Sequence, residues 1–242
     1  SGFIQVPKSW NGYKTQDGPA SGNGYATYYL RIKLPEAIPE LALKILDFAT
    51  AARVFVNGNE VYRVGLVGTS PELTAPQFRP AVVTLDGLKT DIDLVVQVSN
   101  YAHRKGGMWE KIMKGTAAQL QKSRNTQTSY DLILFGSILM IGLYHMGIYI
   151  LRRSELAPFY FGLFCLLIAL RLVTTGERCL LEVFGNVPWE FLIKLEYLSY
   201  DLAVPIFVQF IYCLFSERFS QKWCFTFTMI GLSFSALVFL SP

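Results

Sequence analysis

The stretch Leu132–Leu151 reads LILFGSILMIGLYHMGIYIL and contains no Asp, Glu, Lys or Arg. About 20 apolar residues are what an α-helix needs to cross a hydrocarbon core roughly 30 Å thick. Backbone N–H and C=O groups must be paired in lipid, so an inserted stretch of this kind must be helical. A buried helix of a water-soluble protein is the alternative, but similar apolar runs follow this one and almost none precede it. We therefore predict a membrane-spanning helix that divides the chain into two halves.

The second half, residues 132–242, is predicted to be an all-α transmembrane bundle. Its further apolar runs are Pro158–Thr174, Leu198–Phe215 and Trp223–Leu240. Pro188 precedes Trp189 in a pattern typical of a helix start, so we expect the third spanning helix to begin near Trp189.

The charge of the links predicts the orientation of this bundle. The segments between the apolar runs are the links of the bundle. The first and third links contain Arg152, Arg153, Arg218 and Lys222, which is slightly more Lys and Arg than the middle link contains. The positive-inside rule then predicts that these links lie in the cytoplasm and that the first half of the chain lies outside.

The first half, residues 1–115, has the pattern of an all-β domain. Short β-branched and aromatic runs alternate with turn residues, and no helical periodicity is present, which favours a β-sandwich or jelly roll. Asn57-Gly58 between two such runs predicts a β-hairpin, because both residues tolerate positive φ. The predicted strands are Tyr25–Leu34, Leu41–Phe48, Arg53–Val56, Glu60–Arg63, Val82–Leu85 and Asp93–Val98.

A polar connector, residues 116–131, joins the two halves. Ala117–Arg124 is expected to form a short helix there. At this position it would either transmit a rotation or tilt, or serve as a passive spacer.

The composition and the motifs exclude several classes of protein. Net charge is only +4 and the basic residues are scattered, which argues against a nucleic-acid partner. The sequence has no HExxH, CxxC, Walker or GxSxG motif, so we predict no metal, no cofactor and no enzymatic activity in this chain. No signal peptide precedes the first domain and the sequence ends after an apolar run, so we expect a fragment of a longer protein.

The loop after the last predicted strand is the best candidate for a ligand site. Residues 99–115 concentrate polar, aromatic and glycine residues, and Trp109 could act as a stacking platform. The competing interpretation is that Asn100 caps a turn and Trp109 packs under the loop. The candidate ligand-binding residues are Asn100, Tyr101, His103, Arg104, Trp109 and Glu110.

Polar residues also fall within or near the spans: His145, Arg171, Asp201 and Gln209. Ionisable groups are costly in lipid and usually face the interior of a bundle. They would form a signalling relay in one interpretation, with Arg171 and Asp201 as a pair. In the other, Arg171 reaches the interface and His145 makes an ordinary interhelical hydrogen bond.

Several short motifs, in order, resemble bacterial seven-transmembrane receptors with diverse intracellular signalling modules. The motifs are Gly24–Arg31, Val56–Gly58, Val67–Ser70, Val98–Glu110, Gly142–His145, Ala169–Arg171, Leu195–Ser199 and Leu214–Glu217. The resemblance implies a periplasmic galactose-binding-like jelly roll followed by seven spans, of which this chain contains four. It also implies a location in the bacterial inner membrane and a cytoplasmic effector beyond this chain.

The expected function is a membrane receptor that senses a small molecule, a carbohydrate or a protein outside the cell. The expected partners are membrane lipid, that ligand and a second copy of the chain as a homodimer. The alternatives are a membrane-anchored carbohydrate-binding or glycosidase-accessory protein, and a membrane transporter. A transporter predicts inverted repeats, and the four spans contain no convincing repeat.

Overall fold

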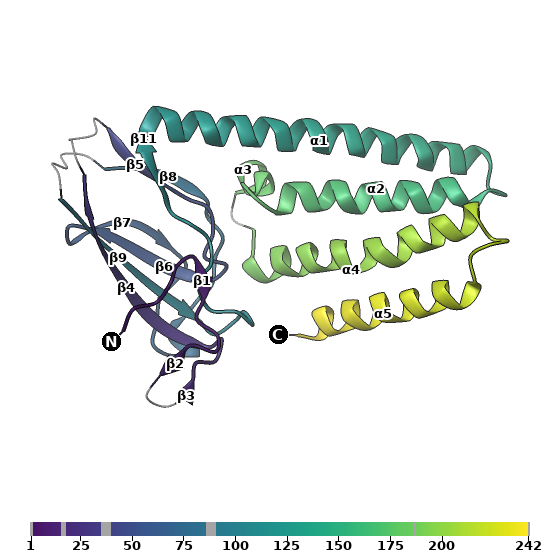
Figure 1. Cartoon of the computed structure of the whole chain (residues 1–242). Coiled ribbons are helices and arrows are strands. Elements are labelled where there is room, and N and C mark those ends of the chain that lie inside the picture. The colour runs from purple at the N-terminus through teal and green to yellow at the C-terminus, as the bar shows by residue number, and fades with distance from the viewer. Residues whose placement is uncertain (1, 16–17, 35–39, 86–90, 186, 242) are drawn as a thin grey trace. The chain divides into compact units, whose positions relative to one another are not determined.

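The computed structural model describes residues 2–15, 18–34, 40–85, 91–185 and 187–241 (Figure 1). The chain forms two compact units, Ser1–Asn125 and Thr126–Pro242. The first contains antiparallel β-sheets and the second contains long apolar helices. The predicted fold class, an all-β domain followed by a transmembrane helical bundle, is confirmed.

The strands of the first unit include all six that the sequence predicted, which correspond to β4 to β9. The remaining strands are two to four residues long and have too few residues to show an alternating pattern. The elements are β1 Lys8–Ser9, β2 Lys14–Thr15, β3 Gly18–Pro19, β4 Gly24–Lys33, β5 Leu41–Ile45, β6 Ala51–Val56, β7 Asn59–Val64, the 3-10 helix η1 Pro71–Leu73, β8 Ala81–Thr84, β9 Asp91–Asn100, β10 Gly107–Met108 and β11 Met113–Thr116.

Two antiparallel sheets form a sandwich of the predicted jelly-roll kind. The strand order is β4-β9-β6-β7 in one sheet and β11-β5-β8 in the other, with the small pairs β1-β10 and β2-β3 beside them. Alternate residues of β9, from Ile92 to Val98, are buried in the same hydrophobic core as Leu43 of β5 and Val54 of β6. This period of two is what a strand with one face against a core requires.

The β6–β7 hairpin confirms the prediction from Asn57-Gly58. Both residues have positive φ, 49° and 84°, and Val56 pairs directly with Asn59 across the turn. Glycine lacks the Cβ that disfavours this region, and Asn tolerates it better than most residues. The turn therefore sets the register of β6 against β7 next to the loop, and the register shifts between Val54 and Phe55 farther along the strands.

The second unit consists of helices α1 Ala117–Leu151, α2 Leu156–Thr174, α3 Cys179–Phe184, α4 Trp189–Leu214 and α5 Gln221–Leu240. All except α3 are long and apolar enough to cross a membrane. The third spanning helix begins at Trp189, as the Pro188 signal predicted. It therefore starts nine residues before the apolar run Leu198–Phe215 that was recognised in the sequence.

Helix α1 is longer than expected, because the connector and the first span form one uninterrupted helix. Thr116 Oγ1 accepts a hydrogen bond from the Gln119 amide, and the Gln119 side chain accepts one from the Thr116 amide. This capping box sets the start of the helix. No Pro or Gly occurs between Ala117 and Phe135 to end it. Ala117–Arg124 is therefore helical, as expected, but it is the first part of a much longer helix.

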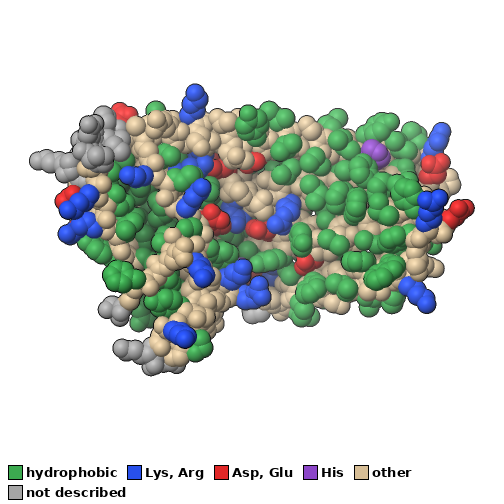
Figure 2. Space-filling view, viewed as in Figure 1, with side chains coloured by type: hydrophobic (Ala, Val, Ile, Leu, Met, Phe, Trp, Pro, Cys, Tyr) green, Lys and Arg blue, Asp and Glu red, His purple; other side chains and the backbone are tan. Residues whose placement is uncertain are grey.

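Small residues bring neighbouring helices close together. A Cβ on Gly162 of α2 would lie 3.0 Å from the Gly142 carbonyl oxygen of α1, and a Cβ on Gly231 of α5 would lie 2.6 Å from Cγ of Pro205 in α4. Such contacts allow the van der Waals packing that holds helices together in lipid. Figure 2 shows hydrophobic side chains over most of the surface of these helices, with charged side chains gathered at the end where α1 leads into α2.

Candidate functional site

Asn100 is the structural centre of the loop that follows β9. Its side chain is fully buried, and its Nδ2 donates to the carbonyl oxygens of Gly22, at 2.8 Å, and His103, at 2.6 Å. Its Oδ1 accepts from the His103 amide at 2.9 Å. These bonds use both amide hydrogens and one acceptor position of the side chain. Asn100 therefore holds the loop in shape.

The opposite side of this loop rests on the segment around Trp10. Trp10 donates from its indole nitrogen to the Gly22 carbonyl at 3.1 Å. Asn11 accepts from the Gly106 amide and donates to the Arg104 carbonyl, both at 3.0 Å. A Cβ on Gly106 would lie 2.4 Å from the Trp10 ring. Only glycine fits there, so the loop is fixed by close backbone packing.

The remaining candidate residues of the loop differ in exposure. The rings of His103 and Trp109 stack with centroids 4.7 Å apart, while Arg104 and Glu110 are exposed. Tyr101 donates from its hydroxyl to the Thr69 carbonyl at 2.7 Å. The indole nitrogen of Trp109 is buried and has no hydrogen-bond acceptor within the described part of the chain. A buried donor of this kind is unusual in a folded protein.

Of the polar residues in the spans, three make contacts between neighbouring helices. His145 of α1 stacks edge-on against Phe161 of α2, while its Nδ1 lies 2.9 Å from the Ile141 carbonyl of its own helix. Gln209 of α4 donates to Thr228 Oγ1 of α5 at 3.1 Å. Arg171 of α2 donates to the Glu196 carbonyl of α4 at 3.0 Å. The two hydrogen bonds join α2 to α4 and α4 to α5, whereas the ring contact joins α1 to α2. The interhelical hydrogen bond suggested for His145 is thus replaced, among the described residues, by a bond within α1.

Arg171 and Asp201, which the sequence suggested as a pair, form no ion pair among the described residues. The Arg171 guanidinium instead lies over the Tyr200 ring, 5.4 Å from its centroid, and Asp201 is half-buried in α4. The backbone of α4 provides the acceptor for Arg171, at Glu196.

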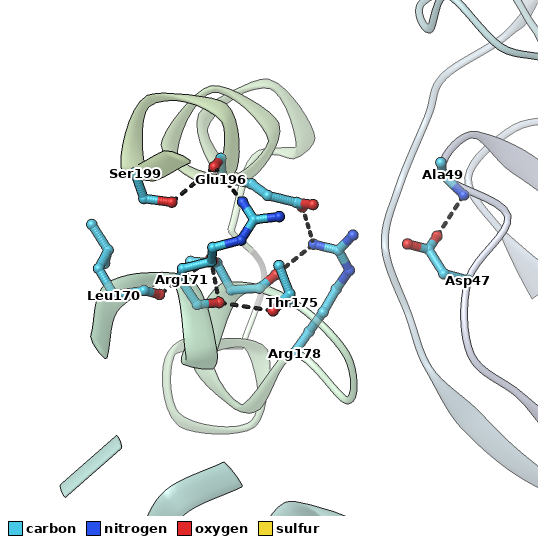
Figure 3. A network of polar contacts seen from close by, with 9 residues as sticks. Asp47, Ala49, Leu170, Arg171, Thr175, Arg178, Glu196 and Ser199 are labelled. Carbon is cyan, nitrogen blue, oxygen red and sulfur yellow. Dashed lines mark hydrogen bonds and ion pairs between the residues drawn. The ribbon is translucent and has the colours of Figure 1, made fainter. Parts of the chain in front are cut away.

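A second arginine, Arg178, forms the main polar cluster at this end of the helices. It lies between α2 and α3 in the left-handed conformation, with φ 54°. Its Nη1 donates to the Thr174 carbonyl at 2.6 Å and to Oε2 of Glu196 at 3.2 Å (Figure 3). The last carbonyl groups of a helix have no partner within the helix, and here the side chains of Arg178, Thr174 and Thr175 satisfy them.

The sequence did not indicate this cluster. Arg178 and Glu196 are 18 residues apart, on either side of α3, and no local pattern connects them. In the sequence, Arg178 is one charge of the link between the second and third spans, and Glu196 falls within the motif Leu195–Ser199. Within the described residues, no group of three or more His, Cys, Asp or Glu side chains is arranged to hold a metal ion.

Comparison with known proteins found a family model that is similar to the helical half of the chain. The family model described as 7TM diverse intracellular signalling matches residues 127–242. No curated protein matches the chain.

Solved structures match the β-rich half. A GH2 β-galacturonidase from Eisenbergiella tayi, bound to galacturonate, is 19% identical with a TM-score of 0.34, over 47% of this chain and 20% of that one. A β-glucuronidase from Bacteroides uniformis is 17% identical with a TM-score of 0.33, over 46% of this chain and 14% of that one. The chain thus spans a fifth or less of the length of these structures.

Proposed function

We propose that the chain is the sensing and membrane part of a bacterial receptor, because residues 127–242 match the family model described as 7TM diverse intracellular signalling. In this proposal the β domain binds a ligand outside the cell, and the helices carry the change to a cytoplasmic effector beyond this chain. The family match is the observation that carries the proposal.

The continuity of α1 supports a direct mechanical connection. The helix begins immediately after strand β11 and continues without interruption into the apolar stretch Leu132–Leu151. A continuous helix transmits displacement along its axis, whereas a flexible linker absorbs it. A ligand that binds two arrangements of the β domain with different affinity would therefore shift the position of α1.

The proposed orientation places the β domain in the periplasm and the protein in the inner membrane. The links that follow α1 and α4 contain Arg152, Arg153 and Arg218, and Lys222 lies in the first turn of α5. Under the positive-inside rule these links lie in the cytoplasm. The first turn of α1 then lies at the periplasmic side. A homodimer within the lipid is part of the same proposal.

The proposed ligand is a small saccharide or a similar small molecule at the loop cluster, which we define as Tyr101, His103, Arg104, Trp109 and Glu110, with the buried Asn100 holding the loop in shape. The exposed Arg104 and Glu110 side chains offer charge-assisted hydrogen bonds to hydroxyl groups. The neighbouring rings of His103 and Trp109, tilted 37° to one another, offer an aromatic surface.

The test is a titration of the whole chain in lipid nanodiscs with monosaccharides and disaccharides, followed by tryptophan fluorescence. We expect a saturable change, and Arg104→Ala should weaken binding about tenfold, because it removes a charged hydrogen-bond donor. Lys14→Ala, which changes an exposed cation elsewhere in the β domain, should bind like the parent. Equal affinity of Arg104→Ala and the parent, or no binding of any saccharide, would contradict the proposed ligand site.

A further inference from the structure

Helix α4 contains a proline in its interior, Pro205, and continues beyond it to Leu214. Proline has no backbone N–H, so the carbonyl oxygen of Asp201, four residues earlier, loses its usual partner within the helix. The proline ring also crowds that carbonyl, and sharp kinks in helices occur mostly at such positions. The backbone of α4 is therefore weakened between Asp201 and Pro205.

A glycine of the neighbouring helix α5 lies against the same carbonyl group. Pro205 and Gly231 are both buried in the helical unit. A Cβ on Gly231 would lie 2.8 Å from the Asp201 carbonyl oxygen and 3.1 Å from Cδ of Pro205. In lipid, a carbonyl that proline has freed is satisfied by neighbouring groups. The backbone of α5 can contribute Cα–H contacts here, which are weaker than the N–H bond that is missing.

The first part of α4, residues 189–201, is tied to α2 by charged groups. Arg171 donates to the Glu196 carbonyl at 3.0 Å, and Arg178, at the end of the turn after α2, donates to the Glu196 carboxylate at 3.2 Å. Hydrogen bonds that involve a charged group are roughly twice as strong as neutral ones. The first part of α4 should therefore keep its position against α2.

The second part of α4, residues 205–214, contacts α2 through aromatic rings. The ring pairs, both with centroids 4.9 Å apart, are Phe164–Phe207 and Phe161–Phe210. Aromatic pairs accept a range of distances and tilts, so they tolerate a shift of one helix against the other. The interhelical hydrogen bond of this part, from Gln209 to Thr228 at 3.1 Å, goes to α5 instead. The second part is therefore tied more closely to α5 than to α2.

We propose that α4 is a hinged helix, in which residues 205–214 swing together with α5 about the contact between Pro205 and Gly231 while the first part stays against α2. A swing of about 20° over roughly 14 Å of helix would displace the end at Leu214 by about 5 Å. This end leads into the link before α5, so the swing displaces that link relative to α1. The hinge lies within the helical unit and does not depend on a ligand of the β domain.

The experiment measures distances between pairs of spin labels by double electron–electron resonance on the whole chain in nanodiscs, with the native cysteines replaced by serine. The hinge pair, Ile150→Cys and Leu214→Cys, joins the last turn of α1 to the end of α4 beyond the proline. The reference pair, Ile133→Cys and Phe191→Cys, joins α1 to the first turn of α4. All four side chains are exposed, so the labels should not disturb the packing. We expect the distance distribution of the hinge pair to be wider than that of the reference pair by about 5 Å.

Pro205→Ala restores the missing N–H, so the distribution of the hinge pair should narrow to the width of the reference pair. The matched control is Pro158→Ala in the first turn of α2, where backbone N–H groups have no partner within the helix. This control should leave the hinge pair as wide as in the parent. Equal widths of the two pairs in the parent would overturn the inference, and this comparison needs no proline variant. So would a hinge pair that stays wide in Pro205→Ala, because fraying at the end of α4 would then explain the width, or one that narrows equally in Pro158→Ala.

Discussion

Arg178 donates from Nη1 to Oε2 of Glu196 across 3.2 Å, which joins the segment between α2 and α3 to helix α4. The Arg178 side chain is only 6% exposed and that of Glu196 is 22% exposed. Removing one partner of such a pair leaves a charge in surroundings of low dielectric constant, where an unpaired charge is costly. The pair therefore matters for the packing of α2 against α4.

Glu196→Ala is expected to destabilise the helical unit by about 3 kcal/mol, because it removes a carboxylate that pairs with the buried Arg178 guanidinium. Thermal unfolding in detergent measures this loss. The control is Glu190→Ala, on the same helix, which breaks an ion pair with Lys194 in which Glu190 is 58% exposed. That change should cost no more than about 1 kcal/mol. Equal losses in the two variants would show that the buried pair has no special role.

Gly231→Ala is expected to disturb the contact between α4 and α5. The new Cβ would lie 2.6 Å from Cγ of Pro205 and 2.8 Å from the Asp201 carbonyl oxygen, so the helices must separate. Overpacking of this kind costs about 1–3 kcal/mol, which a thermal melt in detergent detects. Gly147→Ala in α1 meets no atom within 4 Å and should be neutral or stabilising. A Gly231→Ala variant as stable as Gly147→Ala would contradict the close packing.

Asn100→Ala is expected to destabilise the β domain by about 3 kcal/mol, since it removes three hydrogen bonds in a buried position. Arg104→Ala, four residues along the same loop, removes only an exposed side chain and should change stability by about 0.5 kcal/mol or less. Urea unfolding followed by tryptophan fluorescence compares the two. If Asn100→Ala unfolds at the same urea concentration as Arg104→Ala, Asn100 does not hold the loop in shape.

The stability of the β domain should fall in acid through Glu60. Hydrogen bonds from Arg63 and Arg53 lower the pKa of the Glu60 carboxyl from 4.5 to about 2. A carboxyl whose pKa is lower in the folded state stabilises the protein above the unfolded pKa, and this contribution is lost as pH falls toward the folded pKa. The loss should therefore occur between about pH 4.5 and pH 2.

Urea midpoints measured across this pH range test the assignment to Glu60. Glu60→Gln should be less stable than the parent at neutral pH and should lose less stability on acidification. Arg63→Met should reproduce part of this effect, because it removes the largest cause of the shift. Identical pH dependence in Glu60→Gln and the parent would rule out Glu60 as the source.

The features of the fold that could be predicted from the sequence were local. The alternation of β9, the Asn57-Gly58 turn and the proline before Trp189 each act within a few residues, and the structure contains all three. The apolar run Leu132–Leu151 likewise predicted a helix from its own composition. These patterns determined the fold class.

The features that could not be predicted depend on contacts between distant residues. Asn100 bonds to the carbonyl oxygen of Gly22, 78 residues earlier, and Arg178 reaches Glu196 across α3. No periodicity or motif connects such positions, because the fold alone brings them together. The length of α1 is a different case, because the sequence after Ala117 visibly lacks Pro and Gly. The absence of these helix breakers outweighed the polar composition of the connector, and the helix continues through it.

The central claim is that a β domain outside the cell continues, through α1, into helices embedded in the inner membrane. Its most direct test is labelling of single cysteines by a membrane-impermeant maleimide in intact cells with a permeable outer membrane. The background is a variant in which Cys165, Cys179, Cys213 and Cys224 are replaced by serine. Leu73→Cys, in an exposed turn of the β domain, should label in intact cells, whereas Arg153→Cys, in the link after α1, should label only after the inner membrane is opened. Labelling of Arg153→Cys in intact cells together with protection of Leu73→Cys would contradict the orientation. Recovery of the chain as a soluble monomer without detergent would contradict the membrane assignment itself.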